Sequence, residues 1–186
     1  MAQTPSNMLP LGTKAPPFSL FDTISGNIVN LNDLKGEVGT VIMFICNHCP
    51  FVIHINAELV HLANEYSGKG INCIAISSND VVNYPQDRPE KMKLHAKNEA
   101  YPFPYLYDES QSIAKAYDAA CTPDFYLFDS NLELTYRGQL DDSRPGNTIP
   151  VTGKDLRHAI NCLVNNIDNN APQKPSIGCG IKWKKA

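Results

Sequence analysis

The sequence predicts a single α/β domain, residues 1–186, in which a mixed central sheet carries helices on both faces. Two continuous apolar runs, residues 39–45 and 71–76, have the pattern of strands that are buried on both faces of a sheet. Between them, apolar side chains recur at steps of three and four from Val52 to Tyr66, which indicates one face of a helix. This strand–helix–strand order forms a βαβ unit, so at least part of the sheet is parallel.

Two β-hairpins flank the βαβ unit. The first joins residues 18–21 to residues 28–31 through a turn that contains Gly26, and it forms an N-terminal extension of the sheet. The second joins residues 125–128 to residues 132–136 through a polar turn. Because the strands of a hairpin run antiparallel, the complete sheet is expected to be mixed.

The stretch between the βαβ unit and the second hairpin is predicted to be mainly helical. One helix begins at Pro89 and runs to about residue 100, because proline favours the first helical turn. A shorter helix is capped by Asp108 and Gln111 and runs to Tyr117. The tyrosine- and proline-rich residues 101–107 between these helices are expected to be extended.

A closing helix is predicted to begin at Thr152, with Asp155 in a capping box. Residues 1–15 and 170–186 lack comparable patterns and are expected to form a flexible lead-in and a C-terminal tail. The buried face of the closing helix is expected to contain Leu156, Ala159, Ile160, Leu163, Val164 and Ile167.

Composition and charge exclude several classes of protein. A formal net charge of −3 argues against nucleic-acid binding, and the basic cluster at residues 182–185 is expected to be a solvated tail. The first ten residues lack the features of a secretory signal, and no apolar run is long enough to span a bilayer. We therefore expect a cytoplasmic protein without nucleic-acid or membrane partners, whose six cysteines rest in the reduced form.

Cys46 and Cys49 form a C-x-x-C segment between the first buried strand and the helix that follows it. A helix N-terminus presents unpaired N–H groups and a partial positive charge, both of which stabilise a thiolate. The two-residue spacing lets one sulfur resolve a mixed disulfide formed by the other. In a βαβ setting such a pair predicts dithiol–disulfide exchange, for which no organic cofactor is expected.

Several segments carry a resemblance to a known family. Residues 18–52 join a hairpin to the cysteine-bearing strand, and residues 122–129 read TPDFYLFD. These segments resemble the thioredoxin-like superfamily, in particular the branch that holds the AhpC/TSA (redoxin) proteins and the TlpA/ResA-type thioredoxins. Residues 137–146 and 175–179 are similar to a group of uncharacterised bacterial thioredoxin-family proteins. The resemblance spans roughly residues 12–168, and it implies a thioredoxin-like fold and thiol–disulfide oxidoreductase activity.

The resemblance also implies roles for residues outside the cysteine pair. Pro123 would be a cis-proline that lies against the pair, and Thr122 and Pro123 would hold a substrate chain through backbone contacts. The expected partners are a protein or small-molecule disulfide, or a peroxide, together with an unknown reductant. His48 resembles the histidine of protein disulfide isomerase, whose imidazolium would stabilise the thiolate and raise the reduction potential. The alternative for His48 is a solvated turn residue.

The sequence leaves open which cysteine attacks the substrate. Cys46 is favoured, because the first cysteine is the usual exposed nucleophile of the superfamily, and Cys49 would then resolve the mixed disulfide. Pro50 supports the opposite assignment. Proline prefers the first helical position, which would make Cys49 the N-cap and place it closer to the positive end of the helix dipole.

Peroxidase chemistry with Cys49 as the peroxidatic residue is the main alternative function. Pro50 matches the proline that often follows the peroxidatic cysteine of peroxiredoxins. However, Ile42 and Cys46 stand where the proline and threonine of the peroxiredoxin motif would lie, and the activating arginine expected near Pro123 is missing.

Two further classes of function are also considered. A metal-binding module would use Cys46, Cys49 and Cys121, with His48 or Cys179 as the fourth ligand. A non-catalytic binding protein on the same scaffold is the other. The polar stripe at helical spacing is expected to be a solvated helix face, and it comprises His54, Glu58, His61 and Glu65.

The cysteines outside the pair differ in their expected roles. Cys121 is expected near the pair, either as an additional thiol or as a small buried hydrophobic residue. Cys179 lies between two glycines and is expected to be exposed on a flexible segment, with a C-terminal resolving role as one option. Cys73 and Cys162 are expected to be packing residues.

Overall fold

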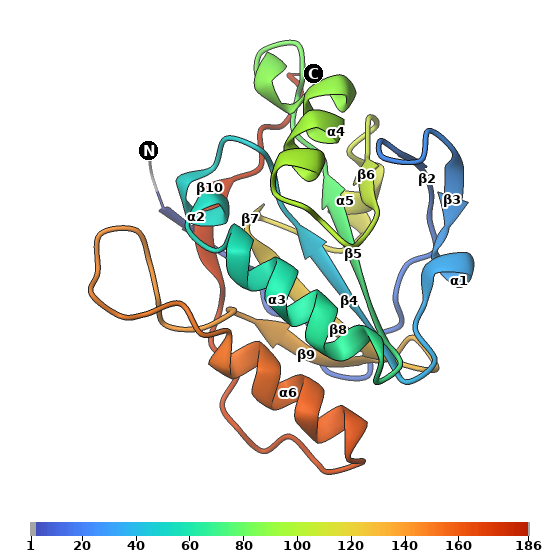
Figure 1. Ribbon diagram of the computed structural model, residues 1–186, viewed down its shortest axis with the longest axis vertical. Coiled ribbons are helices and arrows are strands. Elements are labelled where there is room, and N and C mark those ends of the chain that lie inside the picture. Colours follow the sequence, from blue (N-terminus) through green and yellow to red (C-terminus); the bar gives the residue numbers. More distant parts are fainter. Residues whose placement is uncertain (1–2, 186) are drawn as a thin grey trace.

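The computed structural model describes residues 3–185, which form two β-sheets surrounded by helices (Figure 1). The strands are β1 (Gln3–Pro5), β2 (Ser19–Asp22), β3 (Ile28–Asn30), β4 (Gly39–Phe44), β5 (Ile71–Ser77), β6 (Tyr105–Tyr107), β7 (Cys121–Thr122), β8 (Asp124–Asp129), β9 (Leu134–Gly138) and β10 (Ile177–Gly180). The larger sheet has seven strands in the order β3-β2-β6-β5-β4-β8-β9, and the smaller sheet has the order β1-β10-β7.

Strand β4 is the centre of the larger sheet. It runs parallel to β5, with Gly39 opposite Ile71, and antiparallel to β8, with Phe44 opposite Asp124. Its side chains alternate between two apolar cores, so that Val41 lies in one core and Ile42 in the other. Both faces of β4 are therefore buried, as its continuous apolar run predicts.

Helices cover both faces of the larger sheet. The side chains of α3, α4 and α6 enter the core that contains Val41, whereas those of α1 and α5 enter the core that contains Ile42. This arrangement confirms the predicted thioredoxin-like α/β fold with helices on both faces. The helices are α1 (Leu31–Leu34), α2 (Pro50–Ile53), α3 (Asn56–Ser67), the 3₁₀ helix η1 (Pro85–Asp87), α4 (Pro89–Asn98), α5 (Ser112–Ala116) and α6 (Lys154–Val164).

The two ends of the described chain pair with each other, which differs from the expected lead-in and tail. Strand β1 pairs antiparallel with β10, and the backbone N–H of Ser6 donates to the carbonyl of Ser176 at 2.8 Å. Strand β1 is short and largely polar and β10 is short and glycine-rich, so neither carries a clear local strand signal. Among residues 3–185, no helix is both long and apolar enough to cross a lipid bilayer.

The start of α6 is held by an acid from outside the helix, so the predicted capping box is wrong. The Asp141 carboxylate accepts the backbone N–H groups of Thr152 and Gly153, each at 2.7 Å, and Gly153 adopts a positive φ of 64° as the N-cap. Asp155 accepts a hydrogen bond from Gln139 instead. The helix ends at Val164, which leaves Ile167 exposed and outside its predicted buried face.

A fully buried ion pair joins β8 to β9. The guanidinium of Arg137 donates to the Asp124 carboxylate at 3.1 Å and to the Asp118 carbonyl at 2.7 Å. It also lies over the ring of Tyr126, 4.5 Å from the ring centroid. A charge taken out of water is costly unless it is paired, so each member of this pair depends on the other.

Replacing one partner of this pair should therefore destabilise the protein strongly. We expect Arg137→Ala to lower the free energy of unfolding by about 3–5 kcal/mol, because it leaves the Asp124 carboxylate buried without its cation. Urea denaturation measures the change. The control is Lys14→Ala, which removes a surface ion pair with Glu133 and should cost at most about 1 kcal/mol. Equal losses in the two variants would contradict this account.

Candidate active site

The C-x-x-C segment lies in the connection between the end of β4 and the start of α2. Strand β4 ends at Phe44, and α2 begins at Pro50 with Cys49 as its N-cap. Helix α2 ends after one turn, and α3 begins with Ile55 as its N-cap, so the single helix expected over this stretch is divided in two. Because Pro50 occupies the first helical position, Cys49 is the cysteine nearest to the unpaired N–H groups of the helix.

Both sulfurs of the pair converge on Thr122. The Cys46 sulfur lies 3.5 Å from the Thr122 hydroxyl, and the Cys49 thiol donates to the Thr122 carbonyl at 3.1 Å. The peptide bond between Thr122 and Pro123 is cis. The structure thus places Thr122 and Pro123 against the cysteine pair, although they lie more than seventy residues later in the chain.

The two thiols shift each other's pKa in opposite directions. A hydrogen bond from Cys46 lowers the pKa of Cys49 to about 5, with burial opposing the shift and Cys179 and Thr122 assisting it. The same contact with Cys49, together with burial, raises the pKa of Cys46 well above its ordinary value. The lowered pKa of Cys49 and its N-cap position both favour Cys49 over Cys46 as the thiolate of the reduced pair, which is the second of the two assignments that the sequence leaves open.

His48 is fixed in place by a buried carboxylate. Its Nδ1 lies 2.7 Å from the Asp87 carboxylate, and its ring stacks on Tyr84 with centroids 5.7 Å apart. Asp87 in turn accepts the backbone N–H of Asn47 at 2.9 Å and the side-chain amide of Asn79 at 2.8 Å. With 19% of its side chain exposed, His48 is not a freely solvated turn residue.

Asp87 and Asn79 are the site residues that the sequence analysis missed. Residues 78–80 read SND and follow directly after the buried strand β5. Because β5 is parallel to β4, its carboxyl end lies beside the end that carries the cysteines. Polar residues at the carboxyl ends of neighbouring parallel strands meet at one edge of a sheet, and that rule would have indicated Asn79.

The predicted metal set is not brought together. Among residues 3–185, the group of potential ligands whose atoms lie within 4.8 Å of one another is Cys46, His48 and Asp87. It includes neither Cys49 nor Cys121, and the Asp87 carboxylate is already the acceptor for two protein donors. The prediction of a metal site formed by Cys46, Cys49 and Cys121, with His48 or Cys179 as the fourth ligand, is therefore wrong.

Cys121 and Cys179 are both buried. The Cys121 thiol lies 3.7 Å from the Pro123 carbonyl, and burial raises its pKa far above that of a free thiol. Cys179, which the sequence suggests is exposed, has only 3% of its surface accessible because it belongs to β10. Burial and a hydrogen bond with Cys49 raise the pKa of Cys179 to about 12. Cys73 and Cys162 are buried, as expected of packing residues.

The polar stripe on the helix after the cysteines is engaged by α6. Arg157 pairs with Glu58 at 2.7 Å and also with Glu65. His54 lies 2.7 Å from the Ser143 hydroxyl, whereas the ring of His61 is largely exposed. The stripe is thus a helix–helix contact, and it is only in part the solvated face that its spacing suggests.

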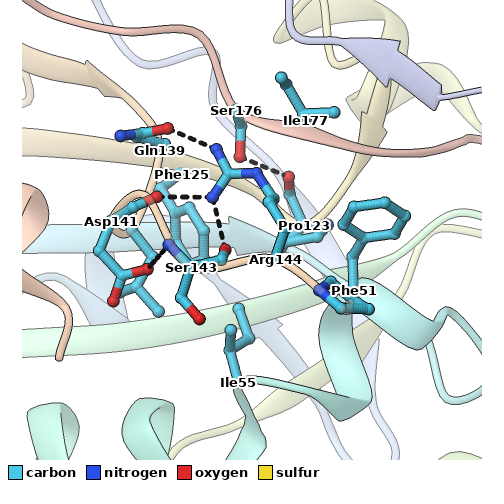
Figure 2. A pocket seen from close by; sticks show the side chains of 12 residues that line it. Phe51, Ile55, Pro123, Phe125, Gln139, Asp141, Ser143, Arg144, Ser176 and Ile177 are labelled. Carbon is cyan, nitrogen blue, oxygen red and sulfur yellow. Dashed lines mark hydrogen bonds between the residues drawn. The ribbon is translucent and has the colours of Figure 1, made fainter. Parts of the chain in front are cut away.

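A small pocket lies beside Pro123, between α2 and β10 (Figure 2). Phe51 and Ile177 face it, and the guanidinium of Arg144 reaches across it to donate to the carbonyls of Asp141 and Ser143, each at 2.6 Å. The free volume of about 10 Å³ is close to the room that one water occupies. The loop that carries Arg144 therefore closes the approach to Pro123 from this side.

The cysteine pair lies one layer below the surface. Cys46 has 2% of its surface accessible and Cys49 has none, whereas Asn47 and His48 are half-buried and Pro50 is exposed. A reagent can therefore reach either sulfur only when the segments that cover the cysteine pair open locally.

These features describe a thioredoxin-like domain with two cysteines at a strand–helix junction. The profile of the AhpC/TSA family matches residues 11–137, more than half of the chain. The chain therefore belongs to the AhpC/TSA family, which confirms the resemblance noted from its sequence.

Solved structures from two bacteria are similar over nearly the whole chain. An uncharacterized conserved protein from Geobacillus kaustophilus is 60% identical, with a TM-score of 0.98 over 100% of this chain and 98% of that chain. A hypothetical protein from Sinorhizobium meliloti 1021 is 46% identical, with a TM-score of 0.96 over 98% of this chain and 100% of that chain.

A more distant structure shares the fold. The thioredoxin domain of a thiol-disulfide oxidoreductase from Bacteroides vulgatus is 21% identical, with a TM-score of 0.66 over 85% of this chain and 100% of that chain. No curated protein matches this chain.

The electrostatics of the pair predict that a thiolate forms at a pH well below the range in which an ordinary thiol ionises. As the pH rises, the reduced pair should lose its first proton with a midpoint near pH 5, so the thiolate predominates at neutral pH. Cys46→Ala removes the largest cause of the lowered pKa and should move the midpoint up towards the ordinary value of 9.0.

The ultraviolet absorbance of the thiolate, followed against pH, measures this midpoint. Cys121→Ala is the matched control, because Cys121 is a buried neighbour of Thr122 that is not among the main causes of the lowered pKa of Cys49. A first proton that leaves only near pH 9.0 in the unsubstituted protein would contradict the assignment.

Proposed function

We propose that the protein is a thiol–disulfide oxidoreductase that exchanges a disulfide through Cys46 and Cys49. The observation that carries this proposal is the convergence of both sulfurs on Thr122 at the junction of β4 and α2. A depressed thiol pKa beside a second thiol is the arrangement that disulfide exchange requires, because the thiolate attacks and the neighbour resolves.

The exchange begins with the Cys49 thiolate. It attacks one sulfur of a substrate disulfide, forms a mixed disulfide and expels the other substrate sulfur as a thiolate. Cys46 then loses its proton, attacks the Cys49 sulfur and expels the second substrate sulfur. The substrate gains two electrons and the chain keeps a Cys46–Cys49 disulfide, which an external thiol reductant returns to the dithiol. The sulfurs carry both electrons, so the expectation of no organic cofactor is retained.

His48 is proposed to set the reduction potential of the pair. The carboxylate of Asp87 at 2.7 Å orients its ring, and the Cys46 sulfur belongs to the same cluster of atoms. An imidazolium at this position stabilises the thiolate and hence the reduced form, which makes the disulfide more oxidising.

Peroxide reduction is the second candidate function. It is favoured by the lowered pKa of Cys49 and by the burial of the pair, because a peroxide needs a smaller opening than a protein disulfide does. Cys49 would then be the peroxidatic residue. The buried Arg137 pairs with Asp124, so its guanidinium does not supply the activating arginine of the peroxidase motif.

Single-turnover rates of the reduced protein with glutathione disulfide and with hydrogen peroxide separate the two candidates. For the oxidoreductase we expect rapid loss of two thiols with the disulfide and a peroxide rate close to that of a free thiol. Cys49→Ser should abolish the reaction, whereas the control Cys73→Ser should retain it. A peroxide rate far above that of a free thiol would instead favour the peroxidase.

His48→Gln should lower the reduction potential of the pair by several tens of millivolts, where about 30 mV corresponds to 1.4 kcal/mol. The substitution removes the charge that stabilises the thiolate and keeps a polar side chain. Equilibration with glutathione buffers measures the potential, and His61→Gln on the exposed side of α3 is the control. Identical potentials for the His48 variant and the unsubstituted protein would refute this role. The cytoplasmic location expected from the sequence stays a prediction.

A further inference from the structure

The backbone edge at Thr122 is already occupied by the chain's own C-terminal strand. Strand β10 pairs antiparallel with β7, with Cys179 opposite Thr122 and Gly180 opposite Cys121. The sequence predicts that a substrate chain is held at this same edge, so Thr122 and Pro123 can take that role only when β10 is displaced. In its place, the protein's own strand presents a cysteine beside the redox pair.

The approach of β10 to this edge is unusually close. A Cβ atom at Gly178 would lie 1.9 Å from the Thr122 carbonyl oxygen. This is a steric clash that every residue except glycine would make. The hydroxyl of Ser176 donates to the Pro123 carbonyl at 2.8 Å, which fixes the strand against the cis-proline (Figure 2). Gly178, the first residue of the sequence Gly-Cys-Gly, is therefore needed for β10 to lie against Thr122.

This placement puts Cys49 between two thiols. The Cys49 thiol reaches the carbonyl of Thr122, and Cys179 is the residue paired with Thr122 across the strands. Cys46, Cys49 and Cys179 belong to one buried cluster, and the antiparallel register puts the side chain of Cys179 on the same face of the small sheet as that of Thr122, whose hydroxyl lies 3.5 Å from the Cys46 sulfur. Cys49 therefore has two neighbours that can resolve a disulfide formed on its sulfur.

The chain beyond Cys179 is tied to the group that orients His48. The backbone N–H of Lys182 donates to the Asn79 side chain at 2.8 Å, and its carbonyl accepts from Asp80 at 2.8 Å. Asn79 also donates to Asp87, the partner of His48. The position of the C-terminal segment is thus coupled through hydrogen bonds to the cysteine pair on both sides of Cys179.

We propose that β10 stands in the place of a substrate strand and that Cys179 is a third redox thiol, which exchanges with the pair through Cys49. This inference rests on the proposed function. The Cys179 sulfur, as a thiolate, attacks Cys49 in the Cys46–Cys49 disulfide. A Cys49–Cys179 bond forms, the Cys46–Cys49 bond breaks, and Cys46 leaves as a thiolate. No electrons enter or leave the chain, and the proton released by Cys179 is taken up by Cys46.

The exchange has a consequence for substrate class. A Cys49–Cys179 disulfide fastens β10 over Thr122, so an extended protein chain cannot pair there until the bond is reduced. Small thiols need no backbone edge. The closed form is therefore reduced by low-molecular-weight thiols, and a protein disulfide can react only after that bond is reduced and β10 is displaced.

The direct test oxidises the full-length Cys46→Ser protein with diamide, which takes two electrons and two protons from a pair of thiols. Mass spectrometry with fragmentation identifies the cross-linked residues. We expect Cys46→Ser to lose two thiols and to contain a Cys49–Cys179 disulfide. The double variant Cys46→Ser/Cys179→Ser should lack it, whereas Cys46→Ser/Cys121→Ser should retain it.

The unsubstituted protein, oxidised in parallel, separates this inference from the proposed function. If it forms a disulfide from Cys46 and Cys49 but the Cys46→Ser variant does not link Cys49 to Cys179, the third-thiol role is overturned while the proposed function stands. If the unsubstituted protein forms no disulfide at Cys49, the proposed function fails and this inference fails with it.

A second variant tests the position of β10 without changing a cysteine. Gly178→Ala places a methyl group against the Thr122 carbonyl, so β10 must move away. We expect the pair to react with a bulky aromatic disulfide reagent about tenfold faster, because opening costs less free energy. Gly68→Ala is the control, since a Cβ there meets open space. Equal rates in the two variants, with circular dichroism spectra that show both folded, would contradict the covering role of β10.

Discussion

The carbonyl oxygen of Thr122 is the point on which the rest of the site depends. It accepts the Cys49 thiol at 3.1 Å, and the glycine of β10 passes so close to it that no larger residue fits. Segments from three distant parts of the chain therefore meet at one peptide unit, and the cis bond to Pro123 belongs to the same unit. The positions of the two sulfurs are restricted by their contacts with Thr122.

The same contact lies in the covered region of the site, so the proposed reactivity of Cys49 has to be reconciled with its burial. The N-cap position and the neighbouring thiols lower the pKa of Cys49, while β10 covers Thr122 and the loop that carries Arg144 closes the approach to Pro123. Thiolate character without free access favours small reagents and slows non-specific oxidation of the pair. Selectivity in this protein thus depends on local opening as well as on the chemistry of the sulfurs.

The sequence predicted those parts that leave a local pattern. The apolar runs of β4 and β5, the amphipathic helix between them and the C-x-x-C segment between strand and helix all identify their own places in the fold. The roles of β10 and Asp87 had no such signal. Strand β10 is short and glycine-rich, and Asp87 lies in an irregular polar stretch, so only tertiary contacts bring them to the cysteines. Cys179 was misjudged for the same reason, because two flanking glycines suggest mobility where they in fact permit close packing.

The central claim is that the sulfurs of Cys46 and Cys49 form one two-electron couple. An equilibrium redox titration of the unsubstituted protein, with free thiols counted by alkylation and mass at each potential, tests it most directly. We expect a single two-electron transition in which two of the six thiols disappear together and Cys49 is always one of them. Retention of all six thiols across the range of glutathione buffers would contradict the account.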